Sequence, residues 1–267
     1  MGNHETAEDG PTRSSRRTFL TASAAATAAA VATPLAAAPA AAATTAPPGP
    51  GRPARPQRPG RELTALLREI DRRRIEATVR RLAAFGTRHT LSSQTDPVRG
   101  IGAARDWIHA QLSGYAAASG GRMSVELQSY VQQPASRIPT ATTITNVVAT
   151  LRGDVTPERV YVITGHYDSR ATDVMDAVSD APGADDDASG VAVVMELARV
   201  LSTRRTEATI VLAAVAAEEQ GLYGSAYLAS QLKAAGVDVS LIFNLCGVAS
   251  GYSKSSFSLC RLSALCW

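Results

Sequence analysis

Residues 208–221 read ATIVLAAVAAEEQG, an unbroken apolar run that ends in two adjacent acids. Strands with such continuous apolar runs are typical of parallel sheets that are covered by helices on both faces. Glu218 and Glu219 come directly after the predicted strand, and ligands of parallel sheets bind outside the carboxyl ends of the strands. This stretch therefore predicts an α/β fold with a site at the carboxyl edge of its sheet.

Helical and strand patterns alternate along the chain from Glu62 onward. Apolar residues at helical spacing predict helices over 63–85 and 101–115, from Ala188 onward, and near 222–235. Apolar runs and alternating patterns predict strands over 123–131, 143–151, 159–164, 208–215 and 239–243. We predict a three-layer α/β/α fold whose central sheet is mixed but mostly parallel, and which is incomplete at the C-terminus.

The first 61 residues are predicted to lie outside the folded domain. Residues 1–45 contain the pair Arg16-Arg17 ahead of an Ala-rich stretch, a pattern typical of a twin-arginine export signal. Two prolines, Pro34 and Pro39, interrupt that stretch and disfavour a membrane span. We therefore expect a secreted protein with no stable membrane association after signal removal. Residues 46–61 are predicted to form an extended Pro- and Arg-rich linker.

The remaining chain divides into a predicted domain over 62–244 and an atypical, Ser-rich tail over 245–267. The formal net charge of +3 owes much to the leader and the linker, so we expect no nucleic-acid partner. The three cysteines, Cys246, Cys260 and Cys266, all lie in the tail. This excludes a disulfide framework for the body of the domain. We expect a monomer.

A second polar cluster follows the predicted strand at 159–164. His166 comes directly after this strand, and the carboxylate of Asp168 can accept a hydrogen bond from one ring nitrogen, which leaves the other for a metal. Each cluster also has a simpler explanation. A histidine at a strand end can be a hydrogen-bonded surface residue, and paired glutamates can be the solvated start of a loop.

Three successive aspartates, residues 185–187, precede the helix predicted from Ala188. One of them can cap the helix, but the crowding of three like charges favours a bound multivalent cation. The spacing from Asp185 to Glu196 also resembles an EF-hand calcium loop. That alternative needs a helix running into the loop, whereas Pro182 and Gly183 precede this one. Oxygen ligands with an imidazole and a spare carboxylate are typical of a hydrolytic metal site.

The motifs GHYDS, APGADDDASGVA and AAEEQGLYGS together resemble the M28 family of zinc aminopeptidases, secreted exopeptidases with two zinc ions. The stretches LAAFGTRHT, GAARDWI and TNVVATLRG are also similar to that family. The resemblance extends from about Glu62 to Asn244. It implies peptide substrates and hydrolysis of the N-terminal aminoacyl bond.

The resemblance also implies a role for each site residue. His166 would bind one zinc and Glu219 the other, while Asp186 would bridge the two ions. Asp168 would orient His166, and Asp187 would shape the bridge and cap the helix, with a cis peptide between residues 186 and 187. Glu218 would be the general base that takes a proton from the attacking water.

The chain departs from the family pattern after Asn244. An aspartate ligand is expected next on the His166 side, but Leu245 and Cys246 stand there, and a later histidine on the Glu219 side does not occur. The other histidines, His89 and His109 in predicted helical regions and His4 in the leader, do not replace it. A shifted reading frame after Asn244 would explain the tail and predicts weak zinc binding with negligible activity. Alternatively, the Cys246 thiolate replaces the aspartate as a zinc ligand.

Three functional hypotheses follow from these observations. The first is a zinc aminopeptidase with a glutamate general base. The second is another zinc hydrolase of the same fold, of carboxypeptidase or glutaminyl-cyclase type. The third is a metal-binding remnant without catalytic activity. Serine hydrolase chemistry is disfavoured, because the chain has no G-x-S-x-G nucleophile turn.

Overall fold

The structure is a computed structural model that describes residues 59–247 and the backbone of 258–260. Its helices are α1 (Arg61–Glu69), α2 (Arg72–Ala83), α3 (Gly100–Ala117), α4 (Gly190–Ser202) and α5 (Tyr223–Ala234), with the irregular turn η1 (Ala184–Ser189) ahead of α4. Its strands are β1 (Met123–Gln132), β2 (Thr142–Leu151), β3 (Thr156–His166), β4 (Ala208–Val215), β5 (Asp238–Leu245) and β6 (Ser258–Cys260). The predicted export signal lies outside the described residues, as does the predicted linker up to residue 58.

The strands form one mixed sheet in the order β1-β2-β4-β3-β5-β6. Strands β4, β3 and β5 are parallel neighbours, whereas β2 is antiparallel to both β1 and β4, and β6 is antiparallel to β5. Strand β1 therefore has the same direction as β4, and only β2 and β6 run the opposite way. The prediction of an α/β fold with a mostly parallel mixed sheet is confirmed.

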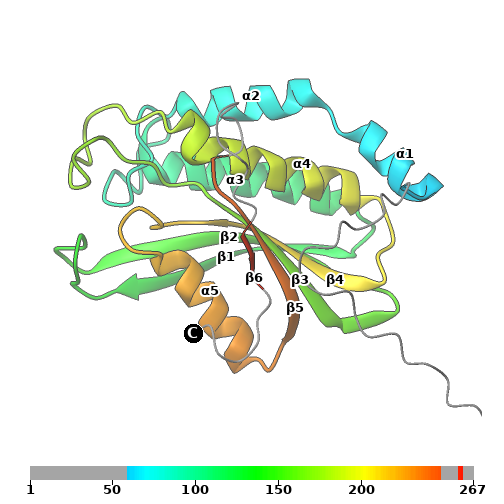
Figure 1. The fold of residues 1–267 in the computed structure, drawn as a ribbon. Coiled ribbons are helices and arrows are strands. Elements are labelled where there is room, and N and C mark those ends of the chain that lie inside the picture. The colour runs from blue at the N-terminus through cyan, green and yellow to red at the C-terminus, as the bar shows by residue number, and fades with distance from the viewer. Residues whose placement is uncertain (1–58, 248–257, 261–267) are drawn as a thin grey trace, which may run out of the picture. The chain divides into compact units, whose positions relative to one another are not determined.

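Helices cover both faces of the sheet, which gives the three predicted layers. Figure 1 shows α2, α3 and α4 on one face and α5 on the other. The larger core, under α2 to α4, includes Leu82, Ile108 and Leu212, and the second core includes Val211 and Leu228. Adjacent strand residues point to opposite faces, so β4 buries both Val211 and Leu212. Full burial of each such side chain contributes about 1.5–3 kcal/mol.

Two features differ from the sequence-based expectations. The predicted helix over 63–85 is broken, because Ile70 is extended and the side chain of Asp71 accepts a hydrogen bond from the Arg73 N–H to cap α2. In the tail, the backbone of β6 pairs with Ile242, Phe243 and Asn244 of β5. The tail thus adds a short strand to the edge of β5, which the sequence pattern did not indicate.

Among residues 59–247, the helices are too short or too polar to cross a bilayer.

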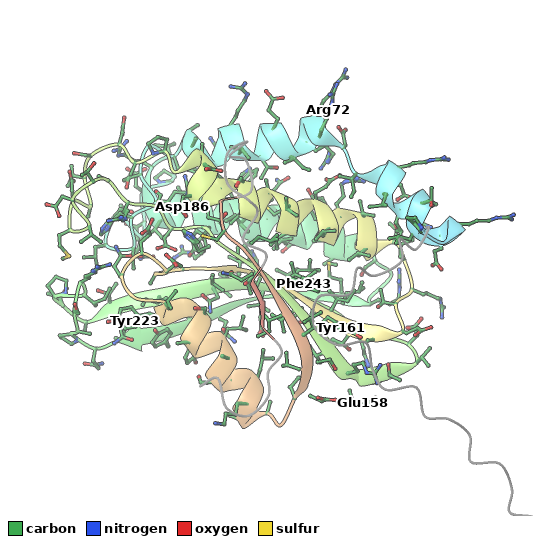
Figure 2. The ribbon with its side chains drawn as sticks, viewed as in Figure 1. Arg72, Glu158, Tyr161, Asp186, Tyr223 and Phe243 are labelled. Carbon is green, nitrogen blue, oxygen red and sulfur yellow. The ribbon has the colours of Figure 1, made fainter. Side chains whose placement is uncertain are left out.

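The three parallel strands bring their carboxyl ends to one edge of the sheet. In the register of β3, Gly165 lies opposite Ala214 of β4 and Leu245 of β5. In Figure 2, Asp186 and Tyr223 lie toward this end of the sheet, and Glu158, near the start of β3, lies toward the other. The polar segments that follow the three strands therefore meet above one edge.

Candidate metal centre

The N-terminus of α4 packs closely against the end of β3. A Cβ atom added at Gly165 would lie 2.8 Å from the carbonyl carbon of Gly190 and from the nitrogen of Val191. Only a glycine allows this approach without a shift of the helix. The result is that η1, which contains the three aspartates, lies directly beside His166.

His166 is buried at the end of β3, and its two ring nitrogens face different carboxylates. Its Nε2 lies 2.9 Å from Oδ1 of Asp186. Its Nδ1 lies 3.2 Å from the carbonyl oxygen of Asp168 and 3.5 Å from a carboxylate oxygen of the same residue. A proton on Nδ1 can thus be donated to Asp168, which leaves Nε2 directed at Asp186 and available to a cation.

Asp187 is a buried carboxylate that connects three elements. Its Oδ2 accepts a hydrogen bond from the His166 N–H at 3.0 Å. Its Oδ1 accepts from the N–H of Gly190, at the start of α4, at 2.9 Å and from that of Gly247 at 3.3 Å. The peptide between Asp186 and Asp187 is cis, as the family resemblance implies. Asp187 therefore caps α4 and joins the end of β3 to the segment that follows β5.

Asp168 is fully buried and connects the histidine to the paired glutamates. Its carboxylate accepts hydrogen bonds from the N–H groups of Glu218 at 3.2 Å and of Glu219 at 3.1 Å. It also lies against the ring of His166. This one carboxylate therefore fixes the relative position of the segments that follow β3 and β4.

The two glutamates lie at the edge of the site and are partly buried. The Glu219 carboxylate forms an ion pair with Arg170, with Nε and Oε2 2.9 Å apart, and its backbone carbonyl accepts a hydrogen bond from Arg137. Ala217, just before the pair, has a left-handed backbone with φ of 58°. The chain thus leaves regular strand geometry there, which allows adjacent side chains to address one site.

The environment shifts the pKa values of these groups in different directions. Burial raises the pKa of Asp187 to about 7 and also raises the pKa of both Glu218 and Glu219. The hydrogen bond from His166 lowers the pKa of Asp186. Burial lowers the pKa of His166, but its hydrogen bonds with Asp168 and Asp186 outweigh burial and raise it. The site therefore concentrates carboxylates around one imidazole, an arrangement that favours a cation.

Cys246, the residue directly after β5, joins this group. Its Sγ lies 3.9 Å from Oδ1 of Asp186, and donor atoms of His166, Asp186 and Cys246 all lie within 4.8 Å of one another. We call these three residues the histidine side, and Glu218, Glu219 and Arg170 the glutamate side. Imidazole, carboxylate and thiolate are all ligands of zinc, so the residues of the histidine side fit this ion.

The calcium-loop alternative is wrong. Glu196, which would be its last ligand, lies within α4 and accepts hydrogen bonds from Arg199 of the same helix. Its Oε1 also accepts from the N–H of Asp71. Glu196 therefore connects α4 to the start of α2 and does not face the aspartates.

Two residues near the site were not predicted. The buried guanidinium of Arg88 donates hydrogen bonds to backbone carbonyls of three separate segments, namely those of Leu82, Tyr167, Pro182 and Gly183. Burial lowers its pKa to about 10. His89 lies in the loop between α2 and α3 and not in a helix as predicted, and its Nε2 lies 3.1 Å from the side-chain nitrogen of Gln220. The stretch LAAFGTRHT contains both residues, but its pattern gave no indication of these contacts.

Comparison with known proteins relates this chain to a peptidase family. Residues 146–263 match the model of peptidase family M28, and the match continues past Asn244 into the tail. A probable zinc metalloprotease of Pyricularia oryzae is 62% identical over 183 residues, which are 68% of this chain. The chain spans only 36% of the length of that relative.

Solved structures show the same fold at lower identity. The LapA aminopeptidase of Legionella pneumophila superposes with a TM-score of 0.55 and 23% identity, over 70% of this chain and 45% of LapA. The glutaminyl cyclase of Porphyromonas gingivalis gives 0.53 and 24%, over 67% of this chain and 60% of the cyclase. The family match, the identity to the zinc metalloprotease and the shared fold agree, and the chain therefore belongs to peptidase family M28.

Proposed function

We propose that this domain is a zinc metallo-aminopeptidase that hydrolyses the N-terminal aminoacyl bond of peptides. The observation that supports this best is the convergence of His166, Asp186 and the Glu218-Glu219 pair above the carboxyl edge of the sheet, with Asp168 hydrogen-bonded between them. In this proposal, His166 and Glu219 would each hold a zinc ion, and Asp186 would be shared between the two positions. Zinc, when bound, supplies a Lewis acid that polarises the scissile carbonyl and favours deprotonation of water.

Glu218 is proposed as the general base. Its carboxylate is half-buried, and burial raises its pKa toward neutrality, where proton transfer in both directions is efficient. It takes a proton from the attacking water while the water oxygen bonds to the carbonyl carbon. As the C–N bond breaks, the same carboxyl group gives that proton to the leaving nitrogen. Asp168 accepts a hydrogen bond from the Glu218 N–H, which fixes the backbone from which the Glu218 carboxylate extends.

The charge of the site supports action at a free N-terminus. Asp185, Asp186, Glu218 and Glu219 gather several carboxylates at this edge, with Arg170 as a neighbouring cation. Clefts lined by one sign of charge attract ligands of the opposite sign. The α-ammonium group of a peptide meets this requirement, whereas an internal peptide segment brings no positive charge to the bond that is cleaved.

The shared fold keeps a second enzymatic hypothesis open to test. A glutaminyl cyclase would release ammonia from an N-terminal glutamine and would not liberate a free amino acid. A third hypothesis, a metal-binding remnant, predicts neither product. The three hypotheses therefore differ in what is released from one peptide with an N-terminal glutamine.

The test uses zinc-loaded protein and matched peptides. We expect release of the first residue from a peptide with a free N-terminus, and no release from the same peptide after N-acetylation. Glu218→Gln should abolish release but retain zinc, since it removes the base and keeps the side-chain volume. Ammonia without a free amino acid would support the cyclase, and equal cleavage of the acetylated peptide would contradict aminopeptidase specificity.

A further inference from the structure

The register of β5 places Cys246 next to His166. Leu245, the last residue of β5, lies opposite Gly165 in the parallel pairing with β3. The next residue after Gly165 is His166, and the next residue after Leu245 is Cys246. The two side chains thus extend from adjacent strand ends, and this placement follows from the sheet and not from a flexible loop.

The backbone after Cys246 is also tied to the site. The N–H of Gly247 donates to Oδ1 of Asp187, the carboxylate that also accepts from the His166 N–H. Gly247 has a φ of 63°, in the left-handed region that glycine adopts without strain. Asp187 therefore connects the backbone of His166 to that of Gly247, which holds the cysteine beside the imidazole.

We propose that Cys246 binds zinc as a thiolate, together with His166 and Asp186. The proposal rests on the proposed zinc-dependent function and specifies one of its ligands. Three protein ligands with one open position are the usual set of a catalytic zinc site, and the histidine side supplies three. Without Cys246, the described residues would leave this position with only a histidine and a shared aspartate.

A thiolate ligand changes which metals the site prefers. Carboxylate and imidazole ligands accept several divalent ions, whereas a thiolate selects softer ones. We expect Zn²⁺ and Cd²⁺ to bind well and Mn²⁺ to bind poorly. The cysteine must also lose its proton when it binds the ion, so metal uptake should release a proton from Cys246.

Cobalt substitution tests the ligand directly. Co²⁺ bound to a thiolate shows a sulfur-to-cobalt charge-transfer band, and we expect this band when the metal-free protein is titrated with Co²⁺. Cys246→Ser should abolish the band and weaken zinc binding at least about tenfold. Loss of a group that only hydrogen-bonds to a metal ligand already costs about 10–100-fold. Cys246→Asp should restore zinc affinity without restoring the band. The matched control, Cys260→Ser with Cys266→Ser, should keep the band.

The outcomes separate this proposal from the proposed function. Cobalt d–d bands without a charge-transfer band, in protein that still loses the ion on His166→Ala, would overturn the thiolate ligand and leave the metal site intact. A band that survives Cys246→Ser but disappears in the double control variant would also overturn it. Failure of Co²⁺ and Zn²⁺ to bind at all would overturn both proposals.

A second readout does not depend on spectroscopy. Cys246 is exposed, so iodoacetamide should alkylate it readily in protein from which metal has been removed. We expect zinc to protect this cysteine, as measured by the rate of modification at each cysteine in peptide mass spectra. Equal rates at Cys246 with and without zinc would contradict the proposal, because a bound thiolate is not free to react.

Discussion

The two sides of the candidate metal centre differ in what holds their ligands. On the histidine side, His166 and Cys246 follow adjacent strands, and buried Asp187 connects their backbones. On the glutamate side, the Glu219 carboxylate is held by the partly exposed side chain of Arg170. The sheet places both ligands of one side, whereas on the other side a cation is paired with the carboxylate of the proposed zinc ligand.

This difference has a direct consequence for metal binding. A zinc ion on the histidine side meets ligands that are already close together, so little ordering is needed. A zinc ion on the glutamate side must first displace Arg170 from Glu219. We therefore expect sequential loading, with the histidine side filled first.

Loss of the histidine should have the largest effect. His166→Ala should weaken binding of the first zinc by more than about 100-fold. Loss of a group that only hydrogen-bonds to a metal ligand already costs up to about 100-fold, and His166 is itself a proposed ligand. The matched variant Glu219→Ala should abolish binding of the second, more weakly bound zinc. The affinity for the first zinc should stay within a few-fold of its original value. Isothermal titration with Zn²⁺ measures both. Equal losses in the two variants would contradict the order of loading.

Asp168→Asn should have an intermediate effect on both sides together. This carboxylate lies against His166 and accepts from the N–H groups of Glu218 and Glu219. The amide removes the negative charge that supports the imidazole and replaces one acceptor with a donor. We expect zinc affinity to fall about 10–100-fold on the histidine side, with weaker binding on the other side as well. An effect on one side only would show that Asp168 does not connect them.

Arg170→Gln should strengthen binding on the glutamate side. The ion pair with Glu219 is partly exposed, and such pairs contribute about 0–1 kcal/mol, so the gain in affinity for the second zinc is at most about fivefold. The matched control is Arg137→Gln, because Arg137 donates a hydrogen bond to the backbone carbonyl of Glu219 and not to its carboxylate. Weaker binding in Arg170→Gln would contradict competition and would indicate that this arginine supports the site.

The sequence predicts the strand-end residues of both sides for the same physical reason. Strand patterns place His166 at the end of β3 and Glu218 shortly after β4, and parallel strands must end at one edge. Cys246 follows β5, so the same argument places it at this edge. From the sequence, a thiolate ligand at Cys246 is one of two explanations for the departure from the family pattern. The proposed thiolate ligand rests on the position of Sγ, which lies 3.9 Å from Oδ1 of Asp186.

The contacts that the sequence could not predict come from loops and long side chains. Arg88 binds carbonyl groups far along the chain, and Arg170 meets Glu219 across a loop whose course has no periodic pattern. The break between α1 and α2 was missed for a similar reason, because the N–H of Asp71 donates to Glu196, a residue of α4. Periodicity describes one element at a time, and these contacts join different elements.

Glu196→Gln should have the smallest effect on the metal and a clear effect on stability, and so it controls for the variants above. The Glu196 side chain is 4% exposed and accepts hydrogen bonds from Arg199 and from the Asp71 N–H. Burial raises its pKa, but these hydrogen bonds outweigh burial and hold the pKa below its ordinary value of 4.5. A carboxylate with a lowered pKa stabilises the fold above the unfolded pKa, and this contribution is lost as the pH falls through the folded pKa.

We therefore expect Glu196→Gln to lower the free energy of unfolding by about 1–3 kcal/mol near neutral pH, since the lost hydrogen bonds involve a charged group. The difference from the unsubstituted protein should begin to shrink as the pH falls below about 4.5 and should disappear below the lowered folded pKa, where that protein also loses the charge. Urea unfolding at several pH values measures this. Zinc affinity should not change, because Glu196 faces α2 and not the aspartates. A parallel loss of zinc would mean that affinity follows overall stability, and the contrast between the two sides would then need to be measured at equal stability.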